Sequence, residues 1–543
     1  MSFLSIFNSF RTKDVAPARV PTDTVIPLHY RDDNTVNRSI GLDFLMQFDD
    51  VLDVDKVIGA LERLLEKPGW RKLGARMRLN EQGKLEYHVP AQFTPSRPAI
   101  NLTRATHDMS ISDHAIGSQL PRPNGSLQVI RDSSKFVPLF CSPDRPRLLK
   151  HYIYTDCAQL SVHVVSFSDA TLVSLSWLHT LLDAMGRRAL FLAWTVMLEG
   201  READVPDFYG YDFDPLAPLG TATTPSSKPE DETEDDHVDD SAPPTGDFVL
   251  RKRQLTGWRK LQFVFNFMWE LFMHPAVESA VVIIPPTFFA SVRAAALADL
   301  RAADPATLVT DTSDPTNPQP FLSDGDVLAA WWIRNIVVAA QPWVATASRT
   351  RTICVMNVLG MRDVLARTAP ALLPLQGGAA YIANCVTAMH SYFSLHELLA
   401  LPLGRIAARL RADLVEQSTR PHIEAREAFA KRAVQATGRE PLFGGPSGSG
   451  DMVISAFSNW TKGRFFETDF RAAVLKPCGR GSGGSAATTG RPTCVLANGT
   501  GNRMFSARGS SCCVGRDAGG NWWVGAQLRS KAWANVEKML EGL

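Results

Sequence analysis

The amino-acid sequence predicts an α/β fold (α+β, with mixed sheets) in two domains, and three observations support that prediction. The chain has 543 residues, which is too long for one small core. Its hydrophobic fraction of 45% and its mean hydropathy of −0.08 are typical of a soluble globular protein. Helix-like and strand-like segments alternate in both halves, which favours helices packed on sheets.

The first half of the chain, residues 1–215, contains a clear succession of predicted elements. An extended segment is expected at Val25–Leu28. Apolar residues at helical spacing predict a helix over Val54–Glu66, which the following Pro68 and Gly69 bring to an end. Strands are predicted around Arg76–Leu79 and Leu85–Val89. We assign these residues to an N-terminal domain.

Residues 216–247 separate the two halves. Between Thr221 and Gly246 the sequence is rich in Pro, Ser, Thr and acidic residues and has no apolar periodicity. Such a segment cannot bury enough surface to offset its ordering entropy. We therefore predict a disordered linker or surface insertion here, in preference to an acidic interaction tail.

The second half, residues 248–543, forms the predicted C-terminal domain. Apolar spacing and capping residues predict three helices and one strand, at Arg251–Met273, Pro286–Leu300, Ser323–Ala340 and Thr352–Val358. A Gly- and Ser-rich composition predicts long loops at residues 479–490 and 498–520. Residues 479–484 match Gly-x-Gly-x-x-Gly, but no βαβ pattern surrounds them, so we predict no nucleotide site.

Composition and charge exclude several classes of function. Lys and Arg (57) balance Asp and Glu (56), so net charge favours neither nucleic-acid nor anionic-membrane binding. The N-terminus lacks the pattern of a signal peptide, and the most apolar helical stretch, Leu261–Met273, is too short and polar to span a bilayer. Eight cysteines without a Cys-x-x-Cys pair indicate neither zinc nor a disulfide scaffold. We expect a cytoplasmic monomer without a metal.

One histidine stands where a predicted strand, Leu172–Leu178, meets a predicted helix, Arg187–Leu198. His179 is followed by Asp183 and then by Gly186, a spacing that chance alone produces often enough to need support. A neutral imidazole at a strand end can accept a proton from a hydroxyl near neutral pH. We therefore predict that His179 is a general base.

The sequence disfavours the competing chemistries at this histidine. A serine nucleophile would need a Gly-x-Ser-x-Gly elbow, which the chain lacks. His163, on a separate strand, is a poor second ligand for a metal. Direct transfer, with the acceptor activated by His179, is the simplest mechanism. Asp183 has three open roles: it holds the imidazole tautomer, anchors the loop through an arginine, or starts the helix as a plain carboxylate.

The segment from Trp177 to Gly186 resembles the His-x-x-x-Asp motif of the BAHD acyltransferases, in their fungal, trichothecene 3-O-acetyltransferase-like branch. Supporting segments follow in the family's order, at Ile26–Leu28, Pro68–Arg76, Ser323–Trp332, Met361–Arg362, Ala380–Asn384, Ser458–Trp460 and Thr468–Phe470. The resemblance covers nearly the whole chain outside the low-complexity insertions.

The resemblance implies two domains of similar fold that enclose an active-site channel, with acyl-CoA entering from one face and the acceptor from the other. By matching position, His179 is the base and Asp183 pairs with Arg362, with Gly186 and Asp469 as structural support. A guanidinium partner would keep the carboxylate ionised and fix the loop. It would also leave the histidine without a carboxylate that raises its pKa.

One motif departs from the family pattern. Where the family has Gly-Trp-Gly after Asp-Phe, this chain has Arg471, Ala472 and Ala473. A donor to the oxyanion from that tryptophan is therefore absent. The candidates for an oxyanion or channel role are Ser458, Trp460 and Asn384, although packing is the simpler role for the first two.

The residues and the resemblance together predict an acyl-CoA-dependent O-acyltransferase. We expect acetyl-CoA as co-substrate, no permanently bound cofactor and no acyl-enzyme, with a small-molecule alcohol such as a terpenoid or polyketide as acceptor. Two alternatives stay open: a non-catalytic ligand-binding protein on the same scaffold, and a transferase whose acyl donor is a carrier protein. No rule that uses a single sequence assigns the identity of the acceptor.

Overall fold

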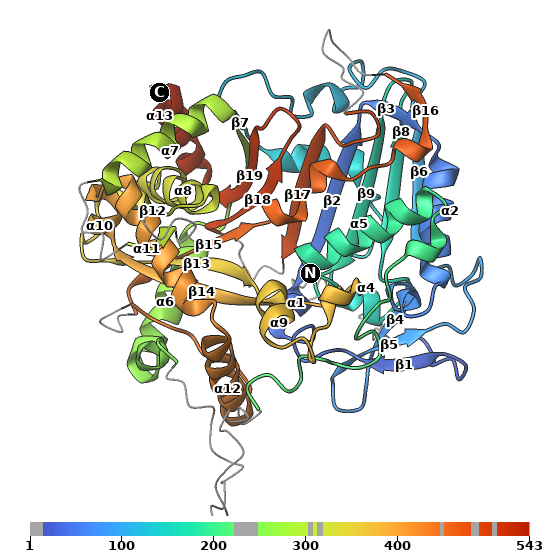
Figure 1. Cartoon of the computed structure of the whole chain (residues 1–543), viewed down its shortest axis with the longest axis horizontal. Helices are drawn as coiled ribbons and strands as arrows, with labels where there is room; N and C mark the ends of the chain where they lie inside the picture. The colour runs from blue at the N-terminus through green and yellow to red at the C-terminus, as the bar shows by residue number, and fades with distance from the viewer. Residues whose placement is uncertain are drawn as a thin grey trace, which may run out of the picture.

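A five-stranded sheet forms the framework of the first half of the computed structural model (Figure 1). Its strands, in spatial order, are β17 (Cys494–Gly501), β2 (Ile40–Phe48), β9 (Thr171–Leu178), β8 (Ser161–Ser166) and β6 (Asn101–Thr106). β2 and β8 both pair antiparallel with β9, and every residue of β9 is buried. The helices α2 (Val54–Glu66) and α5 (Ala184–Leu198) pack against each other beside it. A strand buried on both faces brings its last residue, Leu178, to the centre of the molecule.

A seven-stranded sheet forms the framework of the second half. In spatial order its strands are β14 (Val386–Ser394), β13 (Thr352–Gly360), β15 (Met452–Asn459), β18 (Ser510–Arg516), β19 (Trp522–Leu528), β10 (Glu278–Ile284) and β7 (Gln128–Ile130). The helices α7 (Pro286–Leu300), α8 (Asp324–Trp331) and α11 (Leu403–Gln417) pack on one another and on this sheet. The hydroxyl of Ser323 caps the N-terminus of α8. A π-helical segment, Trp332–Ala339, continues α8 at its C-terminal end.

The remaining elements surround these two sheets, and the structure describes residues 15–221, 248–301, 308–311, 319–445, 450–478, 488–501 and 508–541. The helices are α1 (Thr35–Ser39), α3 (Val137–Phe140), α4 (Leu149–Ile153), α6 (Gly257–Met273), α9 (Arg362–Thr368), α10 (Leu395–Ala400), α12 (Arg420–Thr437) and α13 (Ser530–Glu541). The strands are β1 (Thr24–Pro27), β3 (Asp50–Leu52), β4 (Arg76–Leu79), β5 (Leu85–Val89), β11 (Thr310–Asp311), β12 (Gln319–Pro320) and β16 (Val474–Pro477).

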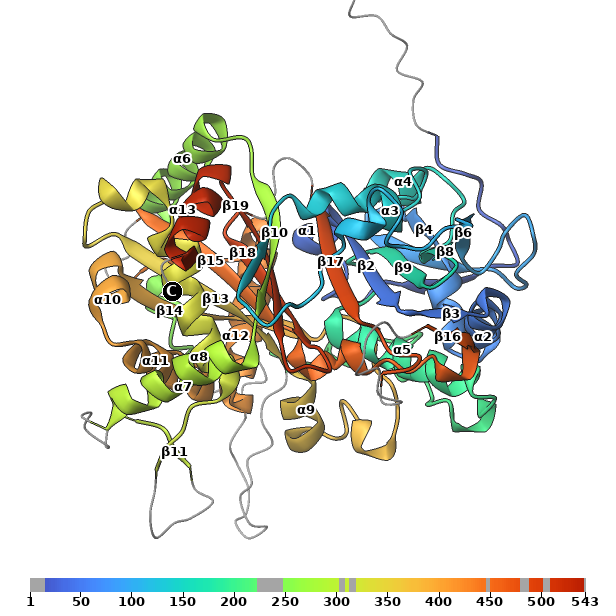
Figure 2. The ribbon, with the colours of Figure 1, turned by 90° about the horizontal axis from the view of Figure 1, so that it is seen from above.

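Strand exchange joins the two halves of the chain. β17, from near the C-terminus, pairs with β2 from Cys494 opposite Gln47 onward, and β16 pairs with β3. In return, β7 from the first half lies at the edge of the seven-stranded sheet beside β10. Figure 2 shows β17 lying next to β2, with β10 on the facing side. Each large sheet therefore contains a strand from the other half, while the division at residues 215 and 248 stays a prediction.

Most predicted elements have the predicted bounds. α2, α7, β4 and β5 match their predicted ranges, and β9 and β13 differ from theirs by one or two residues. The helix predicted over Arg187–Leu198 begins earlier, at Ala184. The predicted linker, residues 216–247, lies outside the described residues from residue 222 onward, and the Gly-x-Gly-x-x-Gly match at residues 479–484 lies wholly outside them.

Two predictions need correction. The single helix over Arg251–Met273 is wrong, because a short turn at Arg251–Arg253 precedes α6. There the Leu255 amide donates to the carbonyl of Leu442 and breaks the helical pattern. The long loop over residues 498–520 is also wrong, since that range contains the end of β17 and all of β18. β18 pairs with both β15 and β19, so tertiary pairing overrides a loop-like composition.

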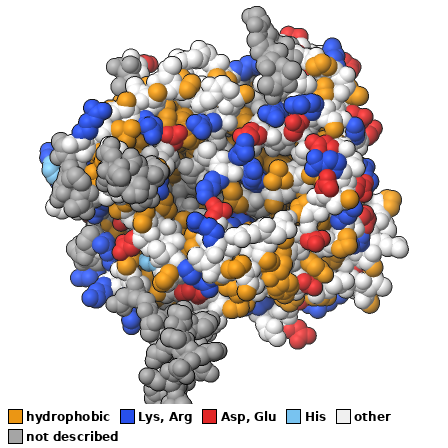
Figure 3. Space-filling model, viewed as in Figure 1, with side chains coloured by type: hydrophobic (Ala, Val, Ile, Leu, Met, Phe, Trp, Pro, Cys, Tyr) orange, Lys and Arg blue, Asp and Glu red, His pale blue; other side chains and the backbone are white. Residues whose placement is uncertain are grey.

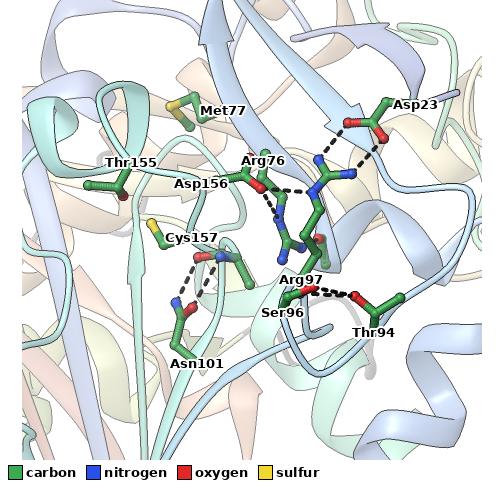
Figure 4. A network of polar contacts seen from close by, with 12 residues as sticks. Asp23, Arg76, Met77, Thr94, Ser96, Arg97, Asn101, Thr155, Asp156 and Cys157 are labelled. Carbon is green, nitrogen blue, oxygen red and sulfur yellow. Dashed lines mark hydrogen bonds and ion pairs between the residues drawn. The ribbon is translucent and has the colours of Figure 1, made fainter. Parts of the chain in front are cut away.

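A polar network fixes the N-terminal strand region (Figure 4). Arg97 donates from Nη1 and Nη2 to the two oxygens of Asp23, at 2.9 and 2.7 Å, and from Nε to Asp156 at 2.7 Å. Arg78 also donates to Asp156. Bidentate geometry of this kind is stronger than a simple ion pair. The network fastens the segment before β1 to the turn between α4 and β8.

Candidate active site

The loop between β9 and α5 carries His179 and is held by backbone contacts. The His179 amide donates to the Ile40 carbonyl at 2.9 Å, and the Leu181 amide donates to the Leu178 carbonyl at 2.9 Å, which forms a tight turn. The hydroxyl of Tyr87 donates to the carbonyl of Thr180 at 3.1 Å. These contacts fix the direction in which the imidazole leaves the strand.

Asp183 is the N-cap of α5, one residue before the helix begins. Its Oδ1 accepts from the Gly186 amide at 2.8 Å, and its Oδ2 accepts from Arg362 Nη1 at 2.8 Å and from the Cys385 amide at 2.9 Å. Burial alone would raise the pKa of this carboxyl. The Arg362 charge and these hydrogen bonds overcome that effect and hold the pKa of Asp183 below its usual value. The carboxylate is therefore ionised and fully partnered.

Arg362 comes from the other half of the chain, at the first residue of α9. Besides its ion pair with Asp183, it donates from Nε to the Tyr381 carbonyl at 3.1 Å and from Nη2 to the Ala383 carbonyl at 2.6 Å. Three of its nitrogens thus have partners, as a buried charge requires. The predicted pairing of Asp183 with Arg362 is present, and it joins the two halves at the histidine loop.

Gly186 is required by close packing in this region. A Cβ at Gly186 would lie 2.0 Å from the carbonyl oxygen of Ile382, a distance that no side chain can tolerate. Glycine in the first turn of α5 therefore lets the helix approach the 381–385 segment closely enough for Asp183 to reach Arg362. The motif's third residue acts through packing.

His179 is enclosed by the protein and lies against a cavity. Burial lowers the pKa of His179, and this effect exceeds the opposite effects of its own carbonyl, of Asp183 and of Asn384. Nδ1 is buried and has no hydrogen-bond partner among the described residues. Nε2 is then the ring nitrogen that can meet a ligand. The imidazole is neutral at neutral pH, as a general base must be.

A cavity of about 1270 Å³ lies between the two halves of the molecule and is lined by His179, Asp183, Arg362, Ser458 and Trp460 together with residues of both sheets. Figure 3 shows the molecule hollowed near its centre, with Lys and Arg side chains around the opening. Arg188, Lys462 and Arg464 are basic residues among those that line the cavity. A space of this size between two sheets can hold two ligands that meet at the histidine.

Ser458 and Trp460 form a hydrogen-bonded pair on the cavity wall. The indole Nε1 of Trp460 donates to Ser458 Oγ at 2.8 Å. Because the hydroxyl accepts this bond, its own proton is available to donate to a ligand. Of the two candidate oxyanion donors, Ser458 is therefore the one that geometry favours, with Trp460 orienting it.

Asn384 and Asp469 do not line the cavity. Asn384 donates from Nδ2 to the His179 carbonyl at 2.9 Å and to Asp32 Oδ1 at 2.7 Å, so it supports the histidine from behind. Asp469 accepts from the Arg471 amide at 2.9 Å and lies near Arg491, in the turn before β16. Its contacts stabilise that turn, away from the histidine.

Arg187 is a cavity residue that the sequence did not indicate. Its guanidinium carbon lies 3.8 Å from the ring centre of Phe44, 4.2 Å from Phe465 and 4.5 Å from Trp460. Nε and Nη2 are buried without hydrogen-bond partners, and no carboxylate pairs with this side chain among the described residues. Burial lowers the pKa of Arg187 to about 9, so it remains a cation at neutral pH. A buried, unpaired positive charge beside the catalytic cavity is electrostatically available to a ligand.

Curated relatives match this chain along its whole length, although no family model matches it. Transcriptional regulator calD of Penicillium decumbens is 35% identical over 537 residues, which cover 98% of this chain and 99% of that protein. Acetyltransferase adrJ of Penicillium rubens is 34% identical over 541 residues, covering 99% of each. Acetyltransferase sphE of Aspergillus fumigatus is 33% identical over 545 residues, covering 98% of each.

Solved structures share the fold at low sequence identity. TRI101 of F. sporotrichioides, complexed with coenzyme A and T-2, has a TM-score of 0.59 at 13% identity, over 95% of this chain and 97% of that one. The chain belongs to the BAHD acyltransferase family. Vinorine synthase superposes with a TM-score of 0.55 at 13% identity, over 97% of this chain and 96% of that one.

These comparisons confirm the predicted fold class, the BAHD family in its fungal branch and the assignment as an acyltransferase. Within the described residues, no helix is both long and apolar enough to cross a membrane, and no group of His, Cys, Asp and Glu is arranged to hold a metal ion. The roles of individual site residues, the monomeric state and the cytoplasmic location stay predictions.

The close approach at Gly186 leads to a stability prediction for this acyltransferase. We expect Gly186→Ala to lower the free energy of unfolding by about 1–3 kcal/mol, because the new methyl group would overlap the Ile382 carbonyl. The matched control is Gly59→Ala in α2, whose Cβ would lie 3.6 Å from Arg63. That change should leave stability equal or higher by about 0.5–1 kcal/mol. Urea unfolding of both variants checks this, and equal effects would contradict it.

The Asp183–Arg362 pair leads to a pH prediction. We expect Asp183→Asn to cost about 3–5 kcal/mol at neutral pH, because Arg362 is left buried without its counter-charge. The folded pKa of Asp183 is depressed, so its stabilisation is fully present above the unfolded pKa of about 3.9 and is lost as pH falls below it. Unfolding curves across that range should converge for the two proteins at low pH. A constant difference would contradict the ion pair as its cause.

Proposed function

We propose that this protein transfers an acetyl group from acetyl-CoA to a hydroxyl of a small secondary metabolite, with His179 as the single general base. The observation that supports this most directly is a buried imidazole of lowered pKa on the cavity wall, whose neighbouring carboxylate is occupied by an arginine and two backbone amides. The relatives named acetyltransferases are consistent with this chemistry. The TRI101 complexes with coenzyme A and T-2 show that this fold accommodates both kinds of ligand at once.

The reaction proceeds in two steps without an acyl-enzyme. His179 removes the proton of the acceptor hydroxyl while that oxygen attacks the thioester carbonyl carbon, and a tetrahedral oxyanion forms. The C–S bond then breaks, and the imidazolium returns the proton to the departing CoA sulfur. General-base assistance of this type contributes about two to four powers of ten in rate.

Two groups on the cavity wall are placed to stabilise the oxyanion. Ser458 has a hydroxyl proton to donate, and Arg187 supplies a positive charge that no described carboxylate neutralises. In a water-poor site, charge held ready for a developing anion is more effective than in solution. Of the basic residues that line the cavity, Lys462 and Arg464 are paired with Asp363 and Glu467, whereas Arg188 donates to the Gly463 carbonyl and has no ion pair among the described residues. These cations would attract the phosphates of CoA.

A non-catalytic role on the same scaffold is the second candidate, because the relative from Penicillium decumbens is named a transcriptional regulator. Intact His179, Asp183 and Arg362 in their full hydrogen-bonded arrangement favour the enzyme. Isothermal titration with acetyl-CoA and a panel of terpenoid and polyketide alcohols, coupled to a thiol assay for released CoA, separates the two. Acceptor binding with no thiol release from any donor would favour the regulator.

The same assay addresses a carrier-protein donor. Our proposal uses free CoA, so saturable turnover with soluble acetyl-CoA at micromolar concentration is expected. We also propose that the enzyme acts as a monomer, since the two halves of one chain complete the cavity, and that it works in the cytoplasm.

The lowered pKa of His179 leads to a prediction on the pH profile. The base acts in its neutral form, so turnover should hold below pH about 6.5, the ordinary histidine value, and fall only at more acidic pH. We expect His179→Ala to lower kcat by about 10²–10⁴-fold and to remove this acidic limb. His163→Ala, on β8 outside the cavity, is the matched control. Full turnover by His179→Ala would refute the base assignment.

Removal of the Arg187 charge should separate activity from stability. We expect Arg187→Met to lower kcat by about 10–10³-fold, because the oxyanion loses a nearby positive charge. Its unfolding free energy should change by no more than about 1 kcal/mol, since the lost ring contacts are offset by relief of a buried unpaired charge. Thermal unfolding and initial rates measure both. A large loss of stability with unchanged kcat would assign Arg187 to packing.

A further inference from the structure

Helix α6 (Gly257–Met273) presents an apolar stripe to solvent. The stripe consists of Trp258, Leu261, Phe265, Trp269 and Phe272, whose side chains are 77, 61, 66, 55 and 75% exposed. Their steps of three and four residues place them on one face of the helix. No residue of α6 is buried. Figure 2 shows the helix at the edge of the molecule. So concentrated a display of large apolar side chains marks an interaction surface.

The opposite face of α6 attaches the helix to the protein through polar groups. Glu270 is paired with Arg508 and Arg529, at 2.8 Å from Arg508 Nη1. Phe263 packs against the small core around Tyr392 and Phe443. The helix is thus held by ion pairs on its inner side, and its apolar side faces outward. This is the reverse of the usual arrangement for a surface helix.

Four cations lie in and just before the first turn of α6, at the N-terminal end of the helix. This basic cluster consists of Arg251, Lys252, Arg259 and Lys260, and none of the four has an ion-pair partner among the described residues. Between residues 251 and 273 the one acidic residue is Glu270, whose carboxylate is already occupied. The helix therefore carries exposed aromatic rings along one face and unneutralised positive charge at its N-terminal end.

We propose that α6 is a membrane-surface helix whose apolar stripe enters the interface of an anionic phospholipid bilayer while the basic cluster contacts acidic head groups. Helices with Trp, Phe and Leu on one face and Lys or Arg beside them lie in the plane of such an interface. Tryptophan in particular favours the head-group level. The helix lies on the bilayer and does not cross it. This inference is independent of the proposed transferase activity.

Two other binding partners, an acidic segment of this chain and a second copy of α6, would each match only the charge or only the apolar stripe. The acidic segment 222–247 carries anions for the basic cluster but contains no Phe, Tyr, Trp, Leu, Ile or Met to cover the stripe. A second copy of α6 would offer apolar residues but no free anion, because Glu270 is engaged. An anionic bilayer supplies both an apolar layer and negative charge. Because the net charge of the whole chain is close to zero, its composition alone does not reveal this local basic cluster.

Vesicle co-sedimentation of the purified full chain tests the proposal. The probe is vesicles of two parts phosphatidylcholine to one part phosphatidylserine, against phosphatidylcholine alone. We expect binding to the mixed vesicles and little to the neutral ones. Phe265→Ser with Trp269→Ser should abolish binding. Arg259→Gln with Lys260→Gln should weaken it by about fivefold for each charge removed.

The matched control is Leu475→Ser with Lys476→Gln on β16, an exposed apolar and basic pair at the opposite end of the molecule (Figure 1). That variant should bind as the parent does. Every substituted side chain is exposed except that of Lys260, which is partly buried. The unfolding temperatures should therefore stay close to that of the parent, which excludes misfolding as the cause. Binding that ignores phosphatidylserine or the α6 substitutions would overturn the proposal. So would a dimer in lipid-free light scattering that the Phe265 and Trp269 changes dissociate, because a second copy would then cover the stripe.

Discussion

The ion pair between Asp183 and Arg362 joins the start of α5 to the 381–385 segment that leads into β14. It connects two parts of the chain that are 179 residues apart in sequence. Each partner also forms hydrogen bonds with backbone groups, so these two buried charges are not left without partners in the low-dielectric interior. The position of the histidine loop, the approach of α5 to Ile382 and the meeting of the two sheets all depend on this contact.

That commitment of Asp183 determines the electrostatics of the histidine. A carboxylate hydrogen-bonded to the imidazole would favour the protonated ring and raise its pKa. Here both carboxylate oxygens are occupied elsewhere, and burial dominates instead, so the pKa of His179 falls. Asn384 takes the orienting role through the His179 backbone carbonyl. The arrangement differs from a nucleophile–histidine–aspartate relay, because Asp183 is bound to the arginine and to backbone amides and leaves the imidazole neutral, as the proposed base must be.

The sequence predicted correctly those helices and strands whose positions depend on the spacing of nearby residues. The helical spacing of α2 and α7 and the buried alternation of β9 suffice for those elements, and the motif spacing together with Arg362 suffices for the central ion pair. The pairing of β17 with β2 joins residues more than 400 positions apart, and no local signal specifies it. Arg187 was missed for a related reason. An arginine on a helix is ordinary in sequence, and only the tertiary gathering of Phe44, Trp460 and Phe465 around it reveals an unpaired charge.

The aromatic rings around Arg187 suggest how the site works without the Gly-Trp-Gly motif. The tryptophan absent after Phe470 is matched by Trp460 at the end of β15, which donates to Ser458 and stacks against the Arg187 guanidinium. One indole thereby orients both a hydroxyl donor and a cation on the same wall of the cavity. A buried arginine without a carboxylate is costly unless a ligand supplies negative charge. In the proposed reaction the transient oxyanion would be such a charge, and it would form only when both substrates are bound. The cost of the unpaired buried charge in the resting site would then fall in the transition state, and that difference would accelerate the reaction.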